Sequence, residues 1–179
     1  MAIVVLDRDG VINHDSDNYI KTVEEWQPIP GAIEAMATLF KAGHRLFVST
    51  NQSGIGRGYY TAETLHAMHE KMLDLLHQAG GKVEGIYYCP HHPDEGCQCR
   101  KPLPGMLDTL MKEHQLTLER SFFVGDSLRD LEAGLARGCQ PILVKTGKGK
   151  RTLEKGLPPH LSHTLIFDDL AQFAHHLSQ

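Results

Sequence analysis

Two aspartates stand at the end of an apolar run near the start of the chain. The run is Ile3-Val4-Val5-Leu6, and it is followed by Asp7-Arg8-Asp9-Gly10. Because side chains in a strand alternate between faces, Asp7 and Asp9 project to the same side and Arg8 projects elsewhere. Two carboxylates held this close tend to differ in their protonation or to recruit a cation, and both behaviours serve catalysis. The alternative is that both acids are simply solvated at a strand end.

Two further apolar runs also end in polar side chains. Residues 45–50 lead into Asn51-Gln52-Ser53, and residues 121–125 lead into Asp126, with Asp130 one helical turn later. In open parallel sheets, ligands bind beyond the carboxyl ends of the strands. We therefore expect these separate strand ends to meet at one edge of a sheet.

The residue types at these ends suit phosphate chemistry. Asp7, Asp9 and Asp126 offer hard oxygen ligands, which Mg²⁺ prefers. One carboxylate of the pair can attack phosphorus, and the neighbour two residues away can pass a proton to the leaving alcohol and take one from water. Thr50 and a cation, for which Lys101 is the candidate, can hold the oxygens of the transferred phosphoryl group.

A second cluster of reactive side chains lies between residues 89 and 99. Three of the four cysteines are here, with two adjacent histidines, whereas Cys139 stands alone. Three thiolates and one imidazole match structural Zn²⁺, with Cys89, Cys97 and Cys99 as ligands and either His91 or His92 as the fourth. A disulfide is the competing interpretation, and reducing conditions oppose it. Since Arg100-Lys101 follows Cys99 directly, a zinc ion here would also position the lysine.

The pattern between these motifs predicts an α/β fold, a Rossmann-like three-layer sandwich with a mostly parallel central sheet in one domain, residues 1–179. The predicted strands are 2–7, 45–50, 84–88, 121–125, 141–145 and 164–167. The predicted helices are 31–42, 61–79, 104–114, 128–137 and 169–178, with Thr61 as an N-cap and Gly80-Gly81 as a stop. Residues 10–29 form a polar excursion that could cover the strand ends. Residues 146–163 are expected to be an irregular basic connection that is simply solvated, with attraction of phosphate as the lesser option.

The net charge and the apolar content of the chain limit which kinds of molecule it can bind. The chain has 179 residues and a formal net charge of −4, so it does not carry the basic footprint of a nucleic-acid-binding protein. No apolar stretch approaches membrane-spanning length, and the first residues lack the pattern of a secretory signal. We expect a cytoplasmic monomer that acts on a small anionic molecule, with no nucleic-acid or membrane partner.

Four ordered motifs resemble those of the haloacid dehalogenase (HAD) superfamily of phosphatases: Asp7-Arg-Asp-Gly, Thr50-Asn, Lys101-Pro and Gly125-Asp126. The resemblance implies a capless HAD fold with an inserted zinc loop at 89–99. It implies Asp7 as nucleophile, Asp9 as general acid/base, and Thr50 and Lys101 as stabilisers of the phosphoryl group. It also implies Mg²⁺ bound by Asp7, Asp126 and the main-chain oxygen of Asp9, with Asp130 supporting the site. Relatives with a Cys-x-His pair favour His91 as the zinc ligand.

Within that superfamily, the segments 50–58, 86–93 and 97–102 resemble a branch of heptose-bisphosphate phosphatases and histidinol-phosphate phosphatases, more closely the former. This resemblance implies hydrolysis of the carbon-7 phosphate of a heptose 1,7-bisphosphate, on the way to nucleotide-activated heptose for lipopolysaccharide or another surface polysaccharide. It leaves the anomer at carbon 1 open.

A bisphosphate needs a second anion contact, for which Arg100 is the candidate because its planar fork can bind two oxygens at once. The candidate contacts to sugar hydroxyls are Asp15, Asn18, Tyr19, Asn51, Gln52 and Ser53. These residue types are equally common in turns that bind nothing. Histidinol phosphate stays open because Asp15 and Asp17 could bind an amine. A polynucleotide 3'-phosphatase and a non-catalytic phosphate-binding module are the remaining alternatives.

Overall fold

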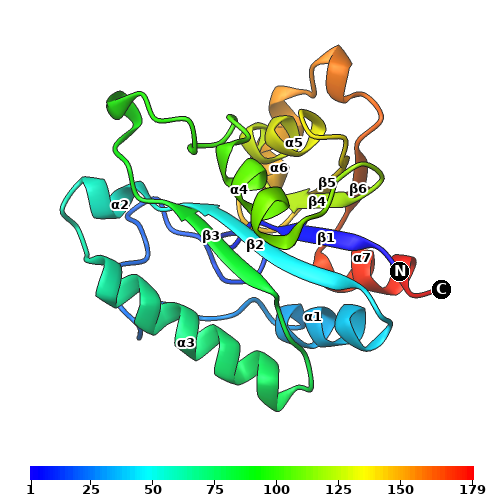
Figure 1. Ribbon diagram of the computed structural model, residues 1–179, viewed down its shortest axis with the longest axis horizontal. Coiled ribbons are helices and arrows are strands. Elements are labelled where there is room, and N and C mark those ends of the chain that lie inside the picture. Colours follow the sequence, from blue (N-terminus) through cyan, green and yellow to red (C-terminus); the bar gives the residue numbers. More distant parts are fainter.

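The computed structural model describes residues 1–179, which form one six-stranded sheet with helices on both faces (Figure 1). All five strand pairs are parallel, and the strand order is β3-β2-β1-β4-β5-β6. The strands are β1 (Ile3–Leu6), β2 (Arg45–Asn51), β3 (Gly85–Cys89), β4 (Phe122–Gly125), β5 (Gln140–Val144) and β6 (Leu165–Phe167). The predicted fold class is confirmed, and each strand lies within one or two residues of its predicted range.

Three helices cover each face. α1 (Ala32–Lys41), α3 (Ala62–Gln78) and α7 (Leu170–Leu177) lie below the sheet in Figure 1, and α4 (Gly105–His114), α5 (Leu128–Leu135) and α6 (Gly149–Lys155) lie above it. Thr61 caps α3 by accepting a hydrogen bond from the Thr64 N–H, as predicted. The remaining short elements are α2 (Ser53–Gly56) and the 3-10 turns η1 (Pro93–Glu95) and η2 (Pro159–Leu161).

Alternation along the strands builds hydrophobic cores on both faces of the sheet. In β1, Val4 and Leu6 join the large cluster between the sheet and helices α1, α3 and α7, whereas Val5 joins the cluster between the sheet and α4. Strands buried on both faces need apolar side chains on both, which explains their nearly continuous hydrophobic sequence. Trp26 is fully buried in the large cluster, so it packs the 10–29 segment against the rest of the protein.

The prediction for residues 146–163 was wrong. This segment contains α6 and η2, and it is packed against the sheet: Gly149 lies so close to the Val144 carbonyl oxygen that no Cβ would fit. The Thr152 hydroxyl is buried and donates to the Asp126 main-chain oxygen at 2.7 Å. A seven-residue helix with mostly basic and polar side chains is too short to show a periodic apolar face, so the sequence pattern concealed it.

The strand order places the chain reversal between β1 and β4, whose carboxyl ends lie side by side with that of β2. This is the position at which sheets of this kind bind ligands. All three ends point to the left in Figure 1, where the 10–29 excursion and the loop after β3 surround them. No helix in the structure combines the length and the apolar character needed to cross a lipid bilayer.

Candidate active site

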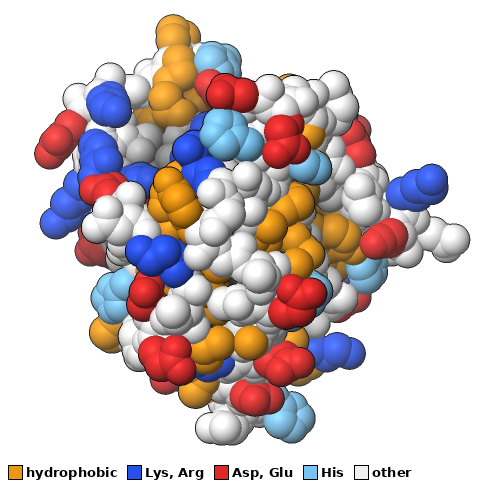
Figure 2. All heavy atoms as spheres, turned by 90° about the vertical axis from the view of Figure 1, so that its left-hand side faces the viewer, with side chains coloured by type: hydrophobic (Ala, Val, Ile, Leu, Met, Phe, Trp, Pro, Cys, Tyr) orange, Lys and Arg blue, Asp and Glu red, His pale blue; other side chains and the backbone are white.

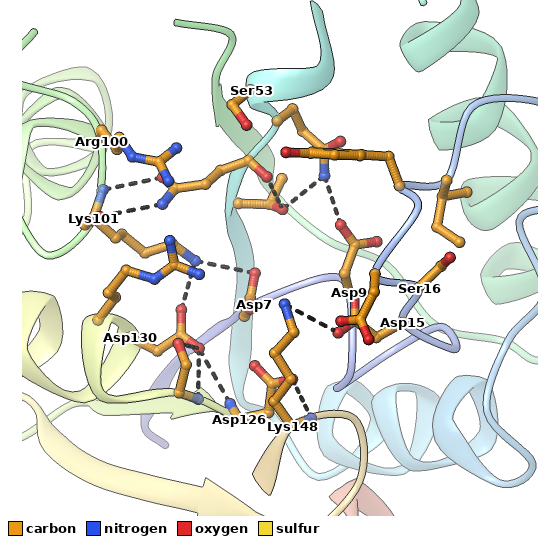
Figure 3. A pocket seen from close by; sticks show the side chains of 18 of the residues that line it. Asp7, Asp9, Asp15, Ser16, Ser53, Arg100, Lys101, Asp126, Asp130 and Lys148 are labelled. Carbon is orange, nitrogen blue, oxygen red and sulfur yellow. Dashed lines mark hydrogen bonds and ion pairs between the residues drawn. The ribbon is translucent and has the colours of Figure 1, made fainter. Parts of the chain in front are cut away.

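A pocket of about 200 Å³ opens over the carboxyl ends of β1, β2 and β4 (Figure 3). Its lining is almost entirely polar, which suits a hydrophilic, charged ligand better than an apolar one. The lining residues are Asp7, Asp9, Asp15, Ser16, Asp17, Tyr19, Ile20, Thr50, Asn51, Gln52, Ser53, Arg57, Tyr60, Arg100, Lys101, Asp126, Ser127, Arg129, Asp130 and Lys148.

Three carboxylates and one ammonium group form the floor of this pocket. One oxygen from each of Asp7, Asp126 and Asp130 lies within 4.8 Å of the others. Lys101 Nζ lies 3.0 Å from Asp7 Oδ1 and 2.7 Å from Asp130 Oδ1, and it donates to the Ser49 carbonyl oxygen at 2.8 Å. The predicted convergence of the β1 and β4 ends is therefore confirmed, and Lys101 joins them from a loop far along the chain.

The charges in this cluster are unbalanced. Burial and repulsion by Asp130 raise the pKa of Asp7 to about 7, although Lys101 opposes the shift. Burial and the same repulsion raise the pKa of Asp126 to about 9. Burial also acts to raise the pKa of Asp130, but Lys101 and Ser127 outweigh it and lower that pKa. Lys101 itself has a raised pKa, because the attraction of Asp130 and Asp7 overcomes its burial.

A divalent cation would relieve this repulsion, and the donor set fits Mg²⁺. Asp7 and Asp126 supply hard carboxylate oxygens, and the Asp9 carbonyl oxygen accepts no hydrogen bond within the protein, so it stays free for an ion. The Lys148 N–H holds Asp126 Oδ2 at 2.9 Å. Asp130 accepts from Lys101, Ser127 and the Asp126 N–H, so its carboxylate serves to orient its neighbours.

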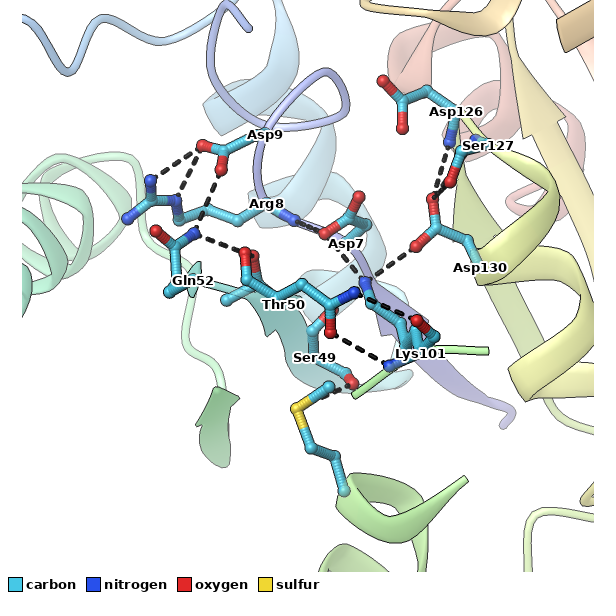
Figure 4. Close-up of polar contacts among 12 residues, drawn as sticks. Asp7, Arg8, Asp9, Ser49, Thr50, Gln52, Lys101, Asp126, Ser127 and Asp130 are labelled. Carbon is cyan, nitrogen blue, oxygen red and sulfur yellow. Dashed lines mark hydrogen bonds and ion pairs between the residues drawn. The ribbon is translucent and has the colours of Figure 1, made fainter. Parts of the chain in front are cut away.

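The Asp9 side chain points away from the three acids, toward buried Arg8 (Figure 4). Arg8 donates to Asp9 Oδ1 through both Nε at 3.0 Å and Nη2 at 2.7 Å, and Asn13 donates to the same oxygen at 2.8 Å. Burial would raise the pKa of Asp9, but Arg8 and Asn13 outweigh it and lower the pKa. The carboxylate is therefore held as an anion, the form that can accept a proton.

The amide side chains of Asn51, the last residue of β2, and of Gln52, which follows it, make contacts that the sequence did not indicate. Asn51 donates to the Lys101 carbonyl oxygen at 3.2 Å and accepts from the Lys101 N–H at 3.0 Å, so it holds the backbone of the lysine. Gln52 contacts Asp9, Thr50 and Tyr60. Asn51 and Gln52 line the pocket, as does Ser53, but the two amides are engaged by the protein itself.

Of the other candidate sugar contacts, Asp15 and Tyr19 line the pocket and Asn18 does not. Asn18 is exposed in a tight turn, where its N–H bonds the Ser16 hydroxyl and its carbonyl accepts from Lys21. Tyr19 follows with a positive φ of 67°, which directs its ring back to the pocket and leaves Asn18 outside. The structure thus gives no support to Asn18 as a ligand contact.

Three arginines on one side of the pocket form a group that we call the arginine wall: Arg57, Arg100 and Arg129. Arg100 Nη1 is buried with no hydrogen-bond partner, and burial together with the positive charges of Arg129 and Arg57 lowers the pKa of Arg100. Figure 2 shows Lys and Arg side chains gathered around a hollow on this face. Cations without acidic partners around a cavity indicate an anion-binding site.

Sequence reasoning found Arg100 but missed Arg57, Arg129 and Lys148, whose Nζ lies 3.5 Å from Asp15 Oδ2. Arg57 stands in the turn after α2, and Arg129 precedes Asp130 in α5. The sequence could have indicated both arginines, because Arg57 follows the Thr50-Asn motif and Arg129 follows the Gly125-Asp126 motif within a few residues. Lys148 belongs to the segment expected to be a solvated basic connection, for which attraction of phosphate was only the lesser option.

The cysteine loop forms a compact cluster at the end of β3. The donor atoms of Cys89, His91, Cys97 and Cys99 all lie within 4.8 Å of one another, and His91 Nδ1 is 3.2 Å from Cys99 Sγ and 3.4 Å from Cys89 Sγ. All four cysteines of the chain are free thiols. Burial acts to raise the pKa of Cys97, yet the N–H groups of Arg100 and Cys99 help lower it to about 6. Three cysteine sulfurs and one imidazole are a ligand set that fits structural Zn²⁺.

The structure separates the two histidines. His91 belongs to the cluster, whereas His92 Nδ1 accepts the Asp94 N–H and caps η1. The cluster thus has the composition predicted with His91, and it could hold zinc. Lys101 follows Cys99 by two residues, so the loop is fixed close to the acids that the lysine contacts.

Comparisons with known proteins agree with this site. Residues 98–173 match a family model described as HAD-hydrolase-like. The chain is 61% identical to D-glycero-beta-D-manno-heptose-1,7-bisphosphate 7-phosphatase of Pseudomonas putida and 57% identical to that of Pseudomonas aeruginosa. These matches cover 99% of this chain in both cases, and 99% and 98% of the respective relatives.

This chain is also similar to a protein of solved structure. The D,D-heptose 1,7-bisphosphate phosphatase of Bordetella bronchiseptica, complexed with magnesium and phosphate, superposes with a TM-score of 0.94 at 47% identity, over 99% of this chain and 98% of that one. Its bound magnesium and phosphate are the two groups that the acidic floor and the pocket suit. On this near full-length similarity, the chain belongs to the HAD-like family of hydrolases.

Proposed function

We propose that this protein is a Mg²⁺-dependent phosphatase that hydrolyses the carbon-7 phosphate of D-glycero-β-D-manno-heptose 1,7-bisphosphate. The observation that carries the proposal is the acidic floor, in which Asp7 lies against Lys101 and Asp126 beside an arginine wall. The relatives are phosphatases of the β anomer of this sugar, and they supply both the sugar and the anomer in the proposal. The product is a heptose 1-phosphate on the way to nucleotide-activated heptose for surface polysaccharide.

Asp7 is the proposed nucleophile. Its Oδ1 accepts from the Arg8 N–H at 2.8 Å and from Lys101 Nζ, whereas its Oδ2 has no hydrogen-bond partner and can attack phosphorus. The new Oδ2–P bond forms as the bond from phosphorus to the sugar oxygen breaks. Asp9, an anion in the free site, first takes up a proton from solvent and passes it to that oxygen, which keeps the electron pair. The product on the enzyme is an aspartyl phosphate on Asp7.

Water completes the turnover. Asp9, now an anion, accepts a proton from water as the water oxygen attacks phosphorus, and the Asp7 carboxylate leaves with inorganic phosphate released. Lys101 and the Thr50 hydroxyl bind the non-bridging oxygens where charge is concentrated. Mg²⁺, when bound by Asp7, Asp126 and the Asp9 carbonyl, supplies positive charge that offsets repulsion between the acids and the phosphoryl group.

The arginine wall is the proposed subsite for the second phosphate. Arg100 brings a buried guanidinium nitrogen with no partner, and Arg57 and Arg129 add charge beside it. Asp15, Tyr19 and Ser53 are the remaining candidates for the sugar hydroxyls. Histidinol phosphate fits less well, because Asp15 is already paired with Lys148 and the wall would face a second cation in the substrate amine.

We also propose that residues 1–179 form one catalytic domain that works as a cytoplasmic monomer, without a nucleic-acid or membrane partner. The single sheet and the relatives of equal length support the domain assignment. The four free thiols suit a reducing compartment, and the net charge of −4 disfavours polyanion binding.

Phosphate release from a substrate panel tests the function. The panel contains the α and β anomers of heptose 1,7-bisphosphate, histidinol phosphate and a 3'-phosphorylated oligonucleotide, each with Mg²⁺ and with chelator. We expect the β anomer to have the highest kcat/KM and Asp7→Asn to lose at least about 10³-fold in kcat. A preference for histidinol phosphate would overturn the substrate, and no turnover of any ester would overturn the enzyme assignment.

A further inference from the structure

The Gln52 side chain forms a bridge between two groups of the reaction. It is only 3% exposed, and its Nε2 donates to Asp9 Oδ2 at 3.0 Å and to Thr50 Oγ1 at 3.0 Å (Figure 4). Both hydrogens of the amide nitrogen are thereby used. Thr50 Oγ1 accepts one of them, so the single proton of the hydroxyl is left to donate elsewhere. Its acceptor in the protein is the Asn51 carbonyl oxygen at a long 3.4 Å.

Tyr60 fixes which way the amide faces. The Tyr60 hydroxyl lies 2.5 Å from Gln52 Oε1 and donates to it, so the nitrogen end must face Asp9 and Thr50. Tyr60 is buried, and burial raises its pKa to about 12, which keeps the phenol protonated and a donor at neutral pH. If the amide were reversed, its nitrogen would face a donor and its oxygen would face the Asp9 carboxylate, which is unfavourable.

Gly54 gives the tyrosine its place. A Cβ on Gly54 would lie 2.2 Å from Tyr60 Cε1, so the ring can occupy this position only beside a glycine. Gly54 has no positive φ, so close approach, rather than a special backbone conformation, requires the glycine here. Gly54 belongs to the same short turn, α2, that follows Gln52. The segment 52–60 thus contains Tyr60, the glycine that leaves room for its ring, and Gln52, which accepts its hydrogen bond.

We propose that Tyr60 and Gln52 are positioning residues that set the Asp9 carboxylate and the Thr50 hydroxyl in their working orientation. The inference rests on the proposed phosphatase function. Arg8 and Asn13 hold Asp9 Oδ1, and Gln52 holds Oδ2, so the carboxylate cannot rotate without breaking contacts on both sides. Tyr60 touches neither Asp9 nor Thr50, and it acts only through the Gln52 amide.

Tyr60→Phe tests the first link, because it removes the hydroxyl and keeps the ring against Gly54. We expect kcat for the heptose bisphosphate to fall about tenfold, the worth of one hydrogen bond, with KM within twofold of wild type. Tyr59→Phe is the matched control, since Tyr59 is 52% exposed and outside the pocket lining, and it should leave both constants unchanged. Thermal unfolding confirms that each variant is folded.

Gln52→Leu and the double variant test the second link. Gln52→Leu should lower kcat about 100-fold, and adding Tyr60→Phe to it should lower kcat no further, because the hydroxyl then has no amide to orient. The inference would be overturned if Tyr60→Phe lowered kcat equally in the wild-type and the Gln52→Leu backgrounds. It would also be overturned if the single variant Tyr60→Phe left kcat unchanged. A rise in the KM of Tyr60→Phe alone would overturn it too, because Tyr60 would then be a substrate contact. If Gln52→Leu does not fold, the kcat and KM of Tyr60→Phe decide whether Tyr60 is a positioning residue.

Wild-type turnover separates the two proposals. If wild type and Tyr59→Phe hydrolyse none of the panel substrates, the proposed function fails first. If both hydrolyse the heptose bisphosphate and Tyr60→Phe matches them, the function stands and the positioning role is wrong.

Discussion

At the scale of single residues, Lys101 is a buried cation that lies between two buried carboxylates. Its ammonium is 3% exposed and lies between Asp7 and Asp130, and the Ser49 carbonyl oxygen takes a further hydrogen bond. The lysine therefore has two separable effects. It compensates two buried negative charges, which supports folding, and in the proposed mechanism it presents charge to the phosphoryl group, which supports catalysis.

Lys101→Met separates these effects. Leaving Asp7 and Asp130 without their buried cation should lower the free energy of unfolding by about 3 to 5 kcal/mol, and kcat should fall at least about 100-fold. Adding Asp130→Asn removes one uncompensated charge, so stability should partly return while kcat stays low. Urea unfolding and steady-state kinetics measure both. Recovery of kcat in the double variant would contradict a direct catalytic role for the lysine.

At the scale of elements, the cysteine loop connects the cluster of Cys89, His91, Cys97 and Cys99 to Lys101, the proposed catalytic cation. Lys101 is two residues from Cys99, and Asn51 at the end of β2 holds its backbone through two hydrogen bonds. The loop therefore fixes the lysine from one side and β2 fixes it from the other. Zinc at the cluster would serve as a positioning device, with all four ligands supplied by the protein.

Cys97→Ser tests this connection. The change removes one proposed zinc ligand, so we expect lower bound zinc by elemental analysis, a lower Tm and a reduced kcat. Cys139→Ala is the control, because Cys139 is buried away from the cluster and should leave zinc content and kcat unchanged. Full turnover in protein shown to be free of zinc would refute the link between the loop and the lysine.

At the scale of the whole molecule, α3 is joined to the sheet by a buried histidine as well as by apolar packing. His69 is almost fully buried, and its Nε2 lies 3.3 Å from Arg8 Nη1. Burial, followed by the charge of Arg8, lowers the pKa of His69 to about 3. The folded protein therefore keeps this ring neutral at pH values where an unfolded chain, with an ordinary histidine pKa near 6.5, takes up a proton.

This difference predicts an acid-sensitive stability. As pH falls from about 6.5 toward 3, only the unfolded state gains the His69 proton, so the free energy of unfolding should decrease by about 1.4 kcal/mol per pH unit from this group. Urea unfolding from pH 7 to 4.5 should show a shallower pH dependence for His69→Gln than for wild type. His77→Gln, on the exposed side of the same helix, should follow wild type. Equal slopes for His69→Gln and wild type would count against the prediction.

The sheet itself could be predicted almost completely. Each strand is a short apolar run bounded by polar residues or glycine, and the covering helices show their apolar spacing, so local pattern was sufficient. The convergence of Asp7 and Asp126 follows from the parallel arrangement of the strands alone. Helix α6 was missed because its inward side consists of Gly149 and Thr152, which do not stand out as apolar.

The sequence by itself determined the strands, the reactive residues at their ends and the composition of the cysteine–histidine cluster, because these depend on neighbours in the chain. Only the tertiary structure decided the partners. Asn51 and Gln52 were predicted to face a sugar, yet their amides bind Lys101 and Asp9, which are 50 and 43 residues away. A hydrogen bond depends on where the fold places both atoms, and no local pattern records a partner so distant in sequence.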